Sequence, residues 1–354
     1  IGYNTKTCNT LRMWSAEPSD DLPVGRDYRK YLSDVDDIVD VKHKFNMGGT
    51  DATEQAVQSA IASVYADLSD KYLYDIKFVT SGGYTDVEDS TAIVTAMKEL
   101  VETRQDCIAL PDVPFGTPKE DVSTFFAQSF NSSYGATYAP WFYVNLPVTN
   151  QQKWMSGSFC FLLTLAQSMI DGNPVWKAPA GISRATVGFA VKPEYEIGSV
   201  LLDLWQNSNV QFVNPIMNIR GNGYTIWGQR TLYTMIDGNP NNRSALQELS
   251  VRLIANEIKR EIRNVALSMT FEENVQYSMT NFEIQIGSYL DEMKRNGAVY
   301  DYKVIMDNTV NSFDDNTIKG IVRVNIARTA ENFEGTELTN DSSMFTLMSV
   351  ARVS

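Results

Sequence analysis

Few residues in this sequence have the type and spacing that catalysis or metal binding requires. His43 is the single histidine, so a Ser-His-Asp or Cys-His pair would have to use it, and a site with several histidine ligands is excluded. The three cysteines, Cys8, Cys107 and Cys160, lie far apart without a CxxC pair, which favours free thiols over a disulfide framework or a zinc site. We therefore expect no enzyme activity, no metal and no cofactor.

Two short loop motifs could still hold a ligand. Ser81-Gly82-Gly83 follows an expected strand, Tyr74–Val79, and a glycine turn at such a place can cradle a phosphate. No Gly-Lys-Ser/Thr follows it and no GxGxxG occurs, so a plain strand-to-helix turn is the stronger interpretation. A nucleotide-binding α/β enzyme remains an alternative. Asp112, directly after Pro111, could ligate a metal, but a single loop aspartate is more often a turn residue.

A basic cluster is the remaining chemical feature. Lys259, Arg260 and Arg263 lie within two turns of one expected helix. They form either a solvated helix face, with Glu257 as an ion-pair partner of Arg260, or a basic strip that meets an acidic partner. The strip stands out because the 354-residue chain has a net charge of -13. That net charge argues against wrapping nucleic acid.

Composition is that of a folded chain with a sizeable core, at 43% hydrophobic and 21% charged residues. No apolar run reaches the length of about 18 residues that a membrane span needs. The sequence begins at Ile1 without a methionine or a signal-peptide pattern, so we expect a fragment or a processed form.

Hydrophobic periodicity predicts the elements that must position these residues. Strands at Tyr74–Val79 and Cys107–Leu110 alternate with helices at Val87–Arg104 and Lys119–Ser129, which indicates a partly parallel α/β layer. The fold class is thus mixed α+β or α/β, with mixed sheets flanked by helices in several domains. Further strands are expected at Thr137–Val144, Val210–Phe212 and Tyr224–Trp227, and further helices at Phe159–Ile170 and Glu196–Asn207.

Two long amphipathic helices dominate the second half, Ala245–Leu267 and Phe271–Arg295, and their apolar stripes predict core packing. Strands at Tyr300–Met306 and Thr317–Ala327 follow. In the latter, apolar residues alternate with polar ones, and such a strand is a candidate for pairing with another chain. The candidate intersubunit strand comprises Ile321, Val322, Arg323, Val324, Asn325 and Ile326. We expect three parts: residues 1–46 from an upstream or inserted domain, an α/β domain at 47–145, and a C-terminal domain at 146–354.

Several further motifs follow one another along the chain: Met47–Asp51, Tyr138–Tyr143, Val175–Pro179, Asn214-Pro215, Asn218–Gly221, Ile226–Leu232, Val304–Asn311 and Ile326–Phe333. In this order they resemble the contractile tail sheath proteins of myovirus-type bacteriophages. The resemblance covers roughly residues 45–340. The chain departs from the pattern at Thr329, where a proline is common, and in its longer tail, Asp341–Ser354. No N-terminal arm of the family is recognisable before Gly48, and residues 1–46 look like the return from an extra domain, as in sheath proteins of giant phages.

The resemblance implies a structural protein of the phage virion, made in the cytoplasm of the host bacterium. Sheath subunits form stacked hexameric rings around a tail tube, with baseplate and tail terminator proteins as further partners and no direct contact with nucleic acid or membrane. Their arms add strands to a small sheet in neighbouring subunits, and contraction drives the tube through the host envelope for genome ejection. By similarity, the basic cluster is a candidate for the tube contact. A type VI secretion or other injection-system sheath or baseplate component is the alternative.

Overall fold

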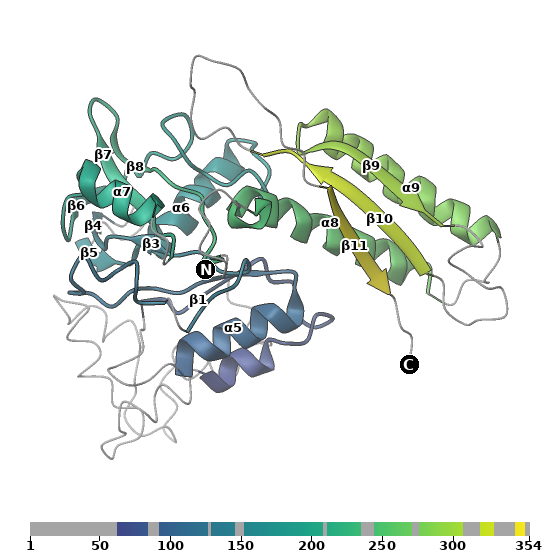
Figure 1. The fold of residues 1–354 in the computed structure, drawn as a ribbon, viewed down its shortest axis with the longest axis horizontal. Coiled ribbons are helices and arrows are strands. Elements are labelled where there is room, and N and C mark those ends of the chain that lie inside the picture. The colour runs from purple at the N-terminus through teal and green to yellow at the C-terminus, as the bar shows by residue number, and fades with distance from the viewer. Residues whose placement is uncertain are drawn as a thin grey trace, which may run out of the picture. The chain divides into compact units, whose positions relative to one another are not determined.

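The computed structural model describes residues 62–83, 92–126, 129–145, 152–207, 211–234, 244–270, 276–306, 319–328 and 344–350. The chain divides into two compact units (Figure 1): unit 1 is Ile1–Gly172 with Pro179–Gly238, and unit 2 is Asn173–Ala178 with Asn239–Ser354. The part predicted at residues 1–46 lies outside the described residues. The boundary predicted after residue 145 falls inside unit 1, and the three-part division stays a prediction.

In the described residues of unit 1, eight strands form three small sheets of mixed direction. The first sheet pairs β1 (Phe78–Thr80) and β2 (Ile108–Leu110) in parallel, with α5 (Ala92–Arg104) between them along the chain. The second has the order β3 (Tyr138–Ala139), β7 (Asn214–Ile219) and β8 (Gly223–Ile226). The third has the order β5 (Gln152–Met155), β4 (Phe142–Asn145) and β6 (Ala190–Pro193).

The core of unit 1 forms where α5 packs against β1 and β2. One face of this helix is apolar, and its residues Ile93, Met97, Leu100 and Val101 are all buried in one cluster. Helix α6 (Gly157–Ile170) begins at the N-cap Ser156, and its first residue must be small, since a Cβ at Gly157 would meet the backbone carbonyl of Tyr138. Helix α7 (Ser199–Asn207) contributes the buried Trp205 to the same core.

Three element predictions in unit 1 are wrong. Residues 119–126 form successive turns and not a helix, because their backbone bonds span three residues and the Lys119 carbonyl accepts from the Trp205 Nε1 at 3.1 Å. The strand predicted at Thr137–Val144 is interrupted at Pro140, so β3 and β4 lie in different sheets. No strand forms at residues 211–212 of the strand predicted at Val210–Phe212, and the next strand begins at Asn214. Its second residue is Pro215, which a strand tolerates near its start.

Unit 2 is a two-layer arrangement of two helices on one antiparallel sheet. Helix α8 spans Leu249–Ser268 after a short 3-10 turn, and α9 spans Gln276–Arg295. The sheet has the order β11 (Met344–Val350), β10 (Lys319–Ile326) and β9 (Val299–Ile305). Helices α8 and α9 lie against this sheet (Figure 1). Apolar residues of both helices form a single core with Val322, Val324 and Ile326 of β10, which confirms the predicted stripes and the alternation along β10.

The predicted fold class, mixed sheets flanked by helices, is confirmed. Trp176 lies in the short stretch Asn173–Ala178, which belongs to unit 2, and it packs against the core of that unit. In the part of the chain that the structure describes, none of the helices is long and apolar enough to cross a membrane.

Candidate functional site

The candidate intersubunit strand lies at the centre of the unit 2 sheet. Strand β10 pairs with β9 over Ile321–Ile326 and with β11 over Lys319–Asn325, antiparallel in both cases. Both hydrogen-bonding edges of β10 are therefore occupied within this chain, and the edges of the sheet are β9 and β11. A strand from another copy could reach β10 only by taking the place of one neighbour, so the intersubunit role of Ile321–Ile326 stays a prediction with that added condition.

The face of the sheet turned away from the helices carries a pair of cations. Arg323 is exposed and lies directly opposite Lys303 of β9, which is also exposed. Like charges directly opposite on antiparallel strands repel each other. On the same strand, Asp301 accepts a hydrogen bond from Lys294 of α9 at 3.2 Å, and this interaction lowers the pKa of Asp301. The edge strand β9 thus carries charges of both signs, and charged side chains on an edge strand discourage unwanted pairing with strands of other chains.

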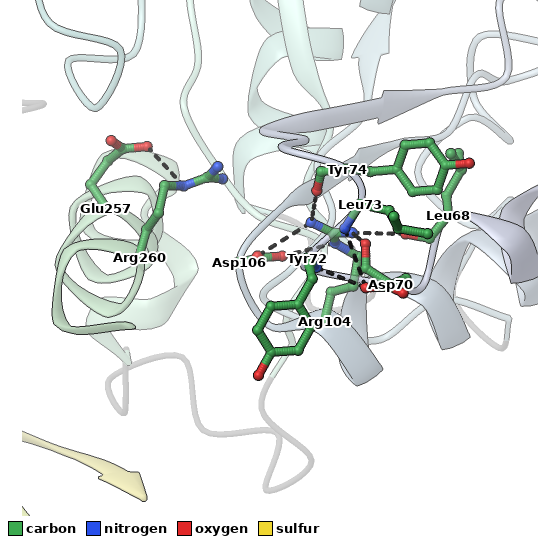
Figure 2. Close-up of polar contacts among 9 residues, drawn as sticks. All are labelled: Leu68, Asp70, Tyr72, Leu73, Tyr74, Arg104, Asp106, Glu257 and Arg260. Atoms are coloured by element: carbon green, nitrogen blue, oxygen red, sulfur yellow. Dashed lines mark hydrogen bonds and ion pairs between the residues drawn. The ribbon is translucent and has the colours of Figure 1, made fainter. Parts of the chain in front are cut away.

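The basic cluster of α8 is partly buried. Arg260 Nε lies 3.9 Å from Glu257 Oε1 (Figure 2), with side-chain exposures of 12% and 19%, so the predicted ion pair is confirmed. Burial and the positive charge of Arg263 lower the pKa of Arg260. Lys259, Arg260 and Arg263 are each half-buried, so the interpretation of a freely solvated face is too simple.

The turn at Ser81–Gly83 already binds an anion of the protein itself. The Gly83 N–H donates to Asp112 Oδ2 at 3.3 Å, and Ser81 Oγ donates to the same oxygen at 3.4 Å. Gly82 and Gly83 have φ angles of 65° and 91°, which glycine adopts readily and other residues do not. A buried carboxylate thus takes the Gly83 N–H that a phosphate cradle would need, which argues against a nucleotide site at this turn.

Asp112 is the residue whose role the sequence did not reveal. It is 3% exposed, follows β2, and lies beside Ser156 and Ser158 at the start of α6. Burial raises its pKa, while interactions with Ser158, Ser156 and the Gly83 N–H act in the opposite direction without cancelling the effect of burial. The carboxylate therefore joins the β1 turn, the end of β2 and the N-terminus of α6. The sequence signal that could have pointed to this residue is an aspartate placed directly after an apolar strand and a proline. In the structure, that strand, β2, is buried at all three positions.

This arrangement predicts how stability changes with pH. Because the folded-state pKa of Asp112 is raised, its protonated form favours the folded state, and stability is lost as pH rises through that pKa. A tenfold difference in proton affinity between the folded and unfolded states corresponds to about 1.4 kcal/mol of stability. In Asp112→Asn, one oxygen still accepts from Gly83, so the melting temperature of this variant minus that of the wild type should increase from pH 4 to pH 7. Melting curves over this range measure the difference, and a difference that does not change with pH would contradict the assignment.

Within the described residues, no group of three or more His, Cys, Asp or Glu side chains could hold a metal ion. Cys107 and Cys160 are free thiols in the interior, and burial raises the pKa of Cys107 to about 12. Among the residues that the structure describes, unit 1 therefore holds the buried carboxylate junction around Asp112, and unit 2 holds the sheet centred on β10 and the basic helix face.

Phage tail sheath proteins are similar to this chain in sequence, although no family model matches it. The tail sheath protein of Enterobacteria phage T4 is 21% identical over 285 residues, covering 75% of this chain and 41% of that protein. The tail sheath protein of Vibrio phage KVP40 is 27% identical over 137 residues, covering 38% of this chain and 19% of that protein. The chain spans less than half the length of these curated relatives.

Solved structures agree on the fold. A chain of the PVC sheath complex, an extracellular contractile injection system in its contracted state, has a TM-score of 0.62 at 19% identity, covering 87% of this chain and 86% of that one. A chain of the anti-feeding prophage baseplate has a TM-score of 0.58 at 18% identity, covering 80% of this chain and 73% of that one. The resemblance predicted from the sequence is confirmed: this chain is similar in sequence to the tail sheath proteins of two bacteriophages, and it shares its fold with chains of contractile injection systems.

Proposed function

We propose that this chain is part of a structural sheath subunit, one that polymerises as stacked hexameric rings around a tail tube. Contraction of this sheath drives the tube through the host envelope and leads to genome ejection. The observation that carries the proposal is the similarity to the T4 tail sheath protein along 75% of the chain. The fold shared with the PVC sheath complex supports it independently.

The proposal includes partners and a location. The subunit contacts other copies of itself, the tail tube, and baseplate and tail terminator proteins, and it is part of the phage virion after synthesis in the cytoplasm of the host bacterium. Its role is mechanical and not enzymatic, since the energy for contraction is stored at assembly. The rigid two-layer packing of unit 2 supports this role, because packed bodies move as wholes and their interfaces switch between discrete arrangements.

Strand exchange is the proposed link between subunits. Strand β11 makes seven residue pairs with β10. An identical strand from a neighbouring copy could make the same main-chain ladder without a change in sequence, as in domain swapping. Ile321–Asn325, the part of the candidate strand that pairs with β11, would then join subunits through main-chain hydrogen bonds, which persist while side-chain contacts change during contraction.

The basic helix face is the proposed tube contact. In Lys259→Glu with Arg263→Glu, two attractive contacts of about 0.5–1 kcal/mol each would be lost, which weakens assembly on the tube by a factor of at least about 5–30. Co-sedimentation of the sheath protein with isolated tubes measures this. Arg295→Glu, an exposed charge reversal at the end of α9, is the matched control. Equal sedimentation of all three proteins would remove this face from the contact.

A sheath of an extracellular injection system is the second candidate function, because the PVC sheath complex named above is an extracellular contractile injection system. The two candidates share the assembly and differ in what the tube delivers. The common part is tested by electron microscopy of the purified protein. Striated hollow tubes are expected, and folded particles that stay monomeric at high concentration would contradict the proposal.

A further inference from the structure

The central strand of unit 2 has both of its edges occupied by strands of the same chain (Figure 1). Strand β11 pairs with β10 over seven residues, from Lys319 opposite Val350 to Asn325 opposite Met344. Strand β9 occupies the other edge. The edge of β10 at which the proposed strand exchange takes place is therefore already filled within the single subunit.

The place beside β10 has to be filled by some strand. Strand β11 lies against α8 as well as beside β10, and β10 contributes Val322 and Val324 to the core of unit 2. An empty place would uncover part of α8 and leave main-chain N–H and C=O groups of β10 without partners, which is unfavourable next to a core. Two occupants satisfy these groups equally well, because the chain's own β11 and the β11 of a neighbouring copy have the same sequence.

The two occupants differ in their concentration at β10. A second strand on the same chain meets its partner at an effective concentration that reaches about the millimolar range, whereas separate subunits in solution are far more dilute. Since the main-chain ladder is the same in both cases, the free subunit keeps its own β11 in place. The strand of a neighbour replaces it only where further contacts hold two subunits side by side, as on a growing sheath.

The outer edge of β9 is a poor substitute for the edge of β10. Asp301 and Lys303 give this strand charges of both signs, and Lys294 of α9 donates a hydrogen bond to Asp301 at 3.2 Å. Charged side chains on an edge strand discourage pairing with a strand of another chain. A subunit whose β11 stays paired with β10 therefore gains no favourable edge for a neighbour at β9.

We propose that β11 is an autoinhibitory strand. By pairing with β10 of its own chain, it keeps the free subunit from linking to a neighbour, and it must leave before the subunit joins a sheath. The inference rests on the proposed function and adds to it the control of assembly. Release of β11 is a step within one subunit, so the rate of assembly should reach a plateau as the subunit concentration is raised.

Two disulfides that share one residue of β10 test the proposal. Position 323 lies directly opposite position 346 of β11 and position 303 of β9. Cysteines at directly opposite positions of antiparallel strands lie within the distance that a disulfide spans. Arg323→Cys with Thr346→Cys fixes β11 to β10, and Arg323→Cys with Lys303→Cys, the matched control, fixes β9 to β10.

Each protein is compared in its oxidised and reduced forms, so the effect of the substitutions themselves cancels. Both carry Cys8→Ser, and the other two cysteines, Cys107 and Cys160, are buried. Oxidation in dilute solution should give disulfides within one chain, seen as monomers on a non-reducing gel. Electron microscopy and light scattering then measure tube formation. The oxidised β10–β11 protein should form tubes many-fold more slowly than its reduced form, whereas the oxidised β10–β9 protein should match its reduced form.

Three results would overturn the proposal. The oxidised β10–β11 protein could form tubes as fast as its reduced form, or both disulfides could slow assembly equally, and in either case the release of β11 is not the step required. Cysteines at 323 and 346 that join only between two chains in dilute solution would show that β11 is not paired within its own chain. If neither the reduced proteins nor the wild type form tubes, the sheath function itself is rejected, and the inference with it.

Discussion

Arg104→Ala should lower the free energy of unfolding by about 3–5 kcal/mol, because it leaves the buried Asp106 carboxylate without its counter-charge. Three backbone carbonyls, of Leu68, Asp70 and Tyr74, also lose their donors. Since a domain is stable by only about 5–15 kcal/mol, a loss of this size is easily measured by urea unfolding followed by fluorescence.

Two further variants separate the effect of the ion pair with Asp106 from the effect of the hydrogen bonds that Arg104 donates to the loop carbonyls. Arg104→Lys keeps the charge beside Asp106 but lacks the planar fork that reaches three carbonyls, so it should lose less stability while the loop Asp70–Tyr74 becomes sensitive to proteases. Glu102→Ala, an exposed position on the same helix, should change stability by less than about 0.5 kcal/mol. If Arg104→Ala were as stable as Glu102→Ala, the hydrogen bonds and the ion pair assigned to Arg104 would not exist in solution.

Val324→Asp should destabilise unit 2 by at least about 3 kcal/mol, because it places an unpaired carboxylate in the core. Val324 is fully buried at the centre of β10 and packs with α8 and α9 in the same cluster. Hydrogen exchange should report the loss locally, with faster exchange of the β9 and β10 amides than in the wild type.

The neighbouring residue supplies the matched control. Arg323 lies on the opposite face, exposed and opposite Lys303. Arg323→Asp converts a like-charge pair into an attractive one, which should leave stability unchanged or raise it by about 0.2–1 kcal/mol. If both variants lost the protection of the β10 amides from hydrogen exchange to the same extent, the assignment of these two residues to opposite faces would be contradicted.

Long amphipathic elements could be predicted from the sequence because their pattern repeats over many residues. The stripes of α8 and α9 and the alternation of Val322, Val324 and Ile326 follow directly from hydrophobic periodicity. The failures are short elements. Strands β5 and β6 have four residues each, and residues 119–126 are held by tertiary contacts such as the Trp205 bond to the Lys119 carbonyl. A local pattern does not contain such contacts.

The candidate sites show the same division. The Glu257–Arg260 ion pair could be predicted because it lies within one helix turn. The contacts of Asp112 and Arg104 could not be predicted, because their partners lie far away in the sequence. Asp112 bonds Gly83, 29 residues before it, and Arg104 bonds the carbonyls of Leu68, Asp70 and Tyr74, 30 to 36 residues before it. The central place of β10 could not be predicted either, since the sequence pattern does not reveal that β11 pairs on its second edge.

Cryo-electron microscopy of the assembled protein, before and after contraction is triggered by mild denaturant, tests the central claim most directly. We predict a helical tube whose subunits keep the internal structure of unit 1 and of unit 2 in both states. The tube should become shorter and wider, while a strand of a neighbouring copy stays paired with β10. A protein that forms no tube, or a tube of one fixed geometry whose subunits share no strands, would contradict it.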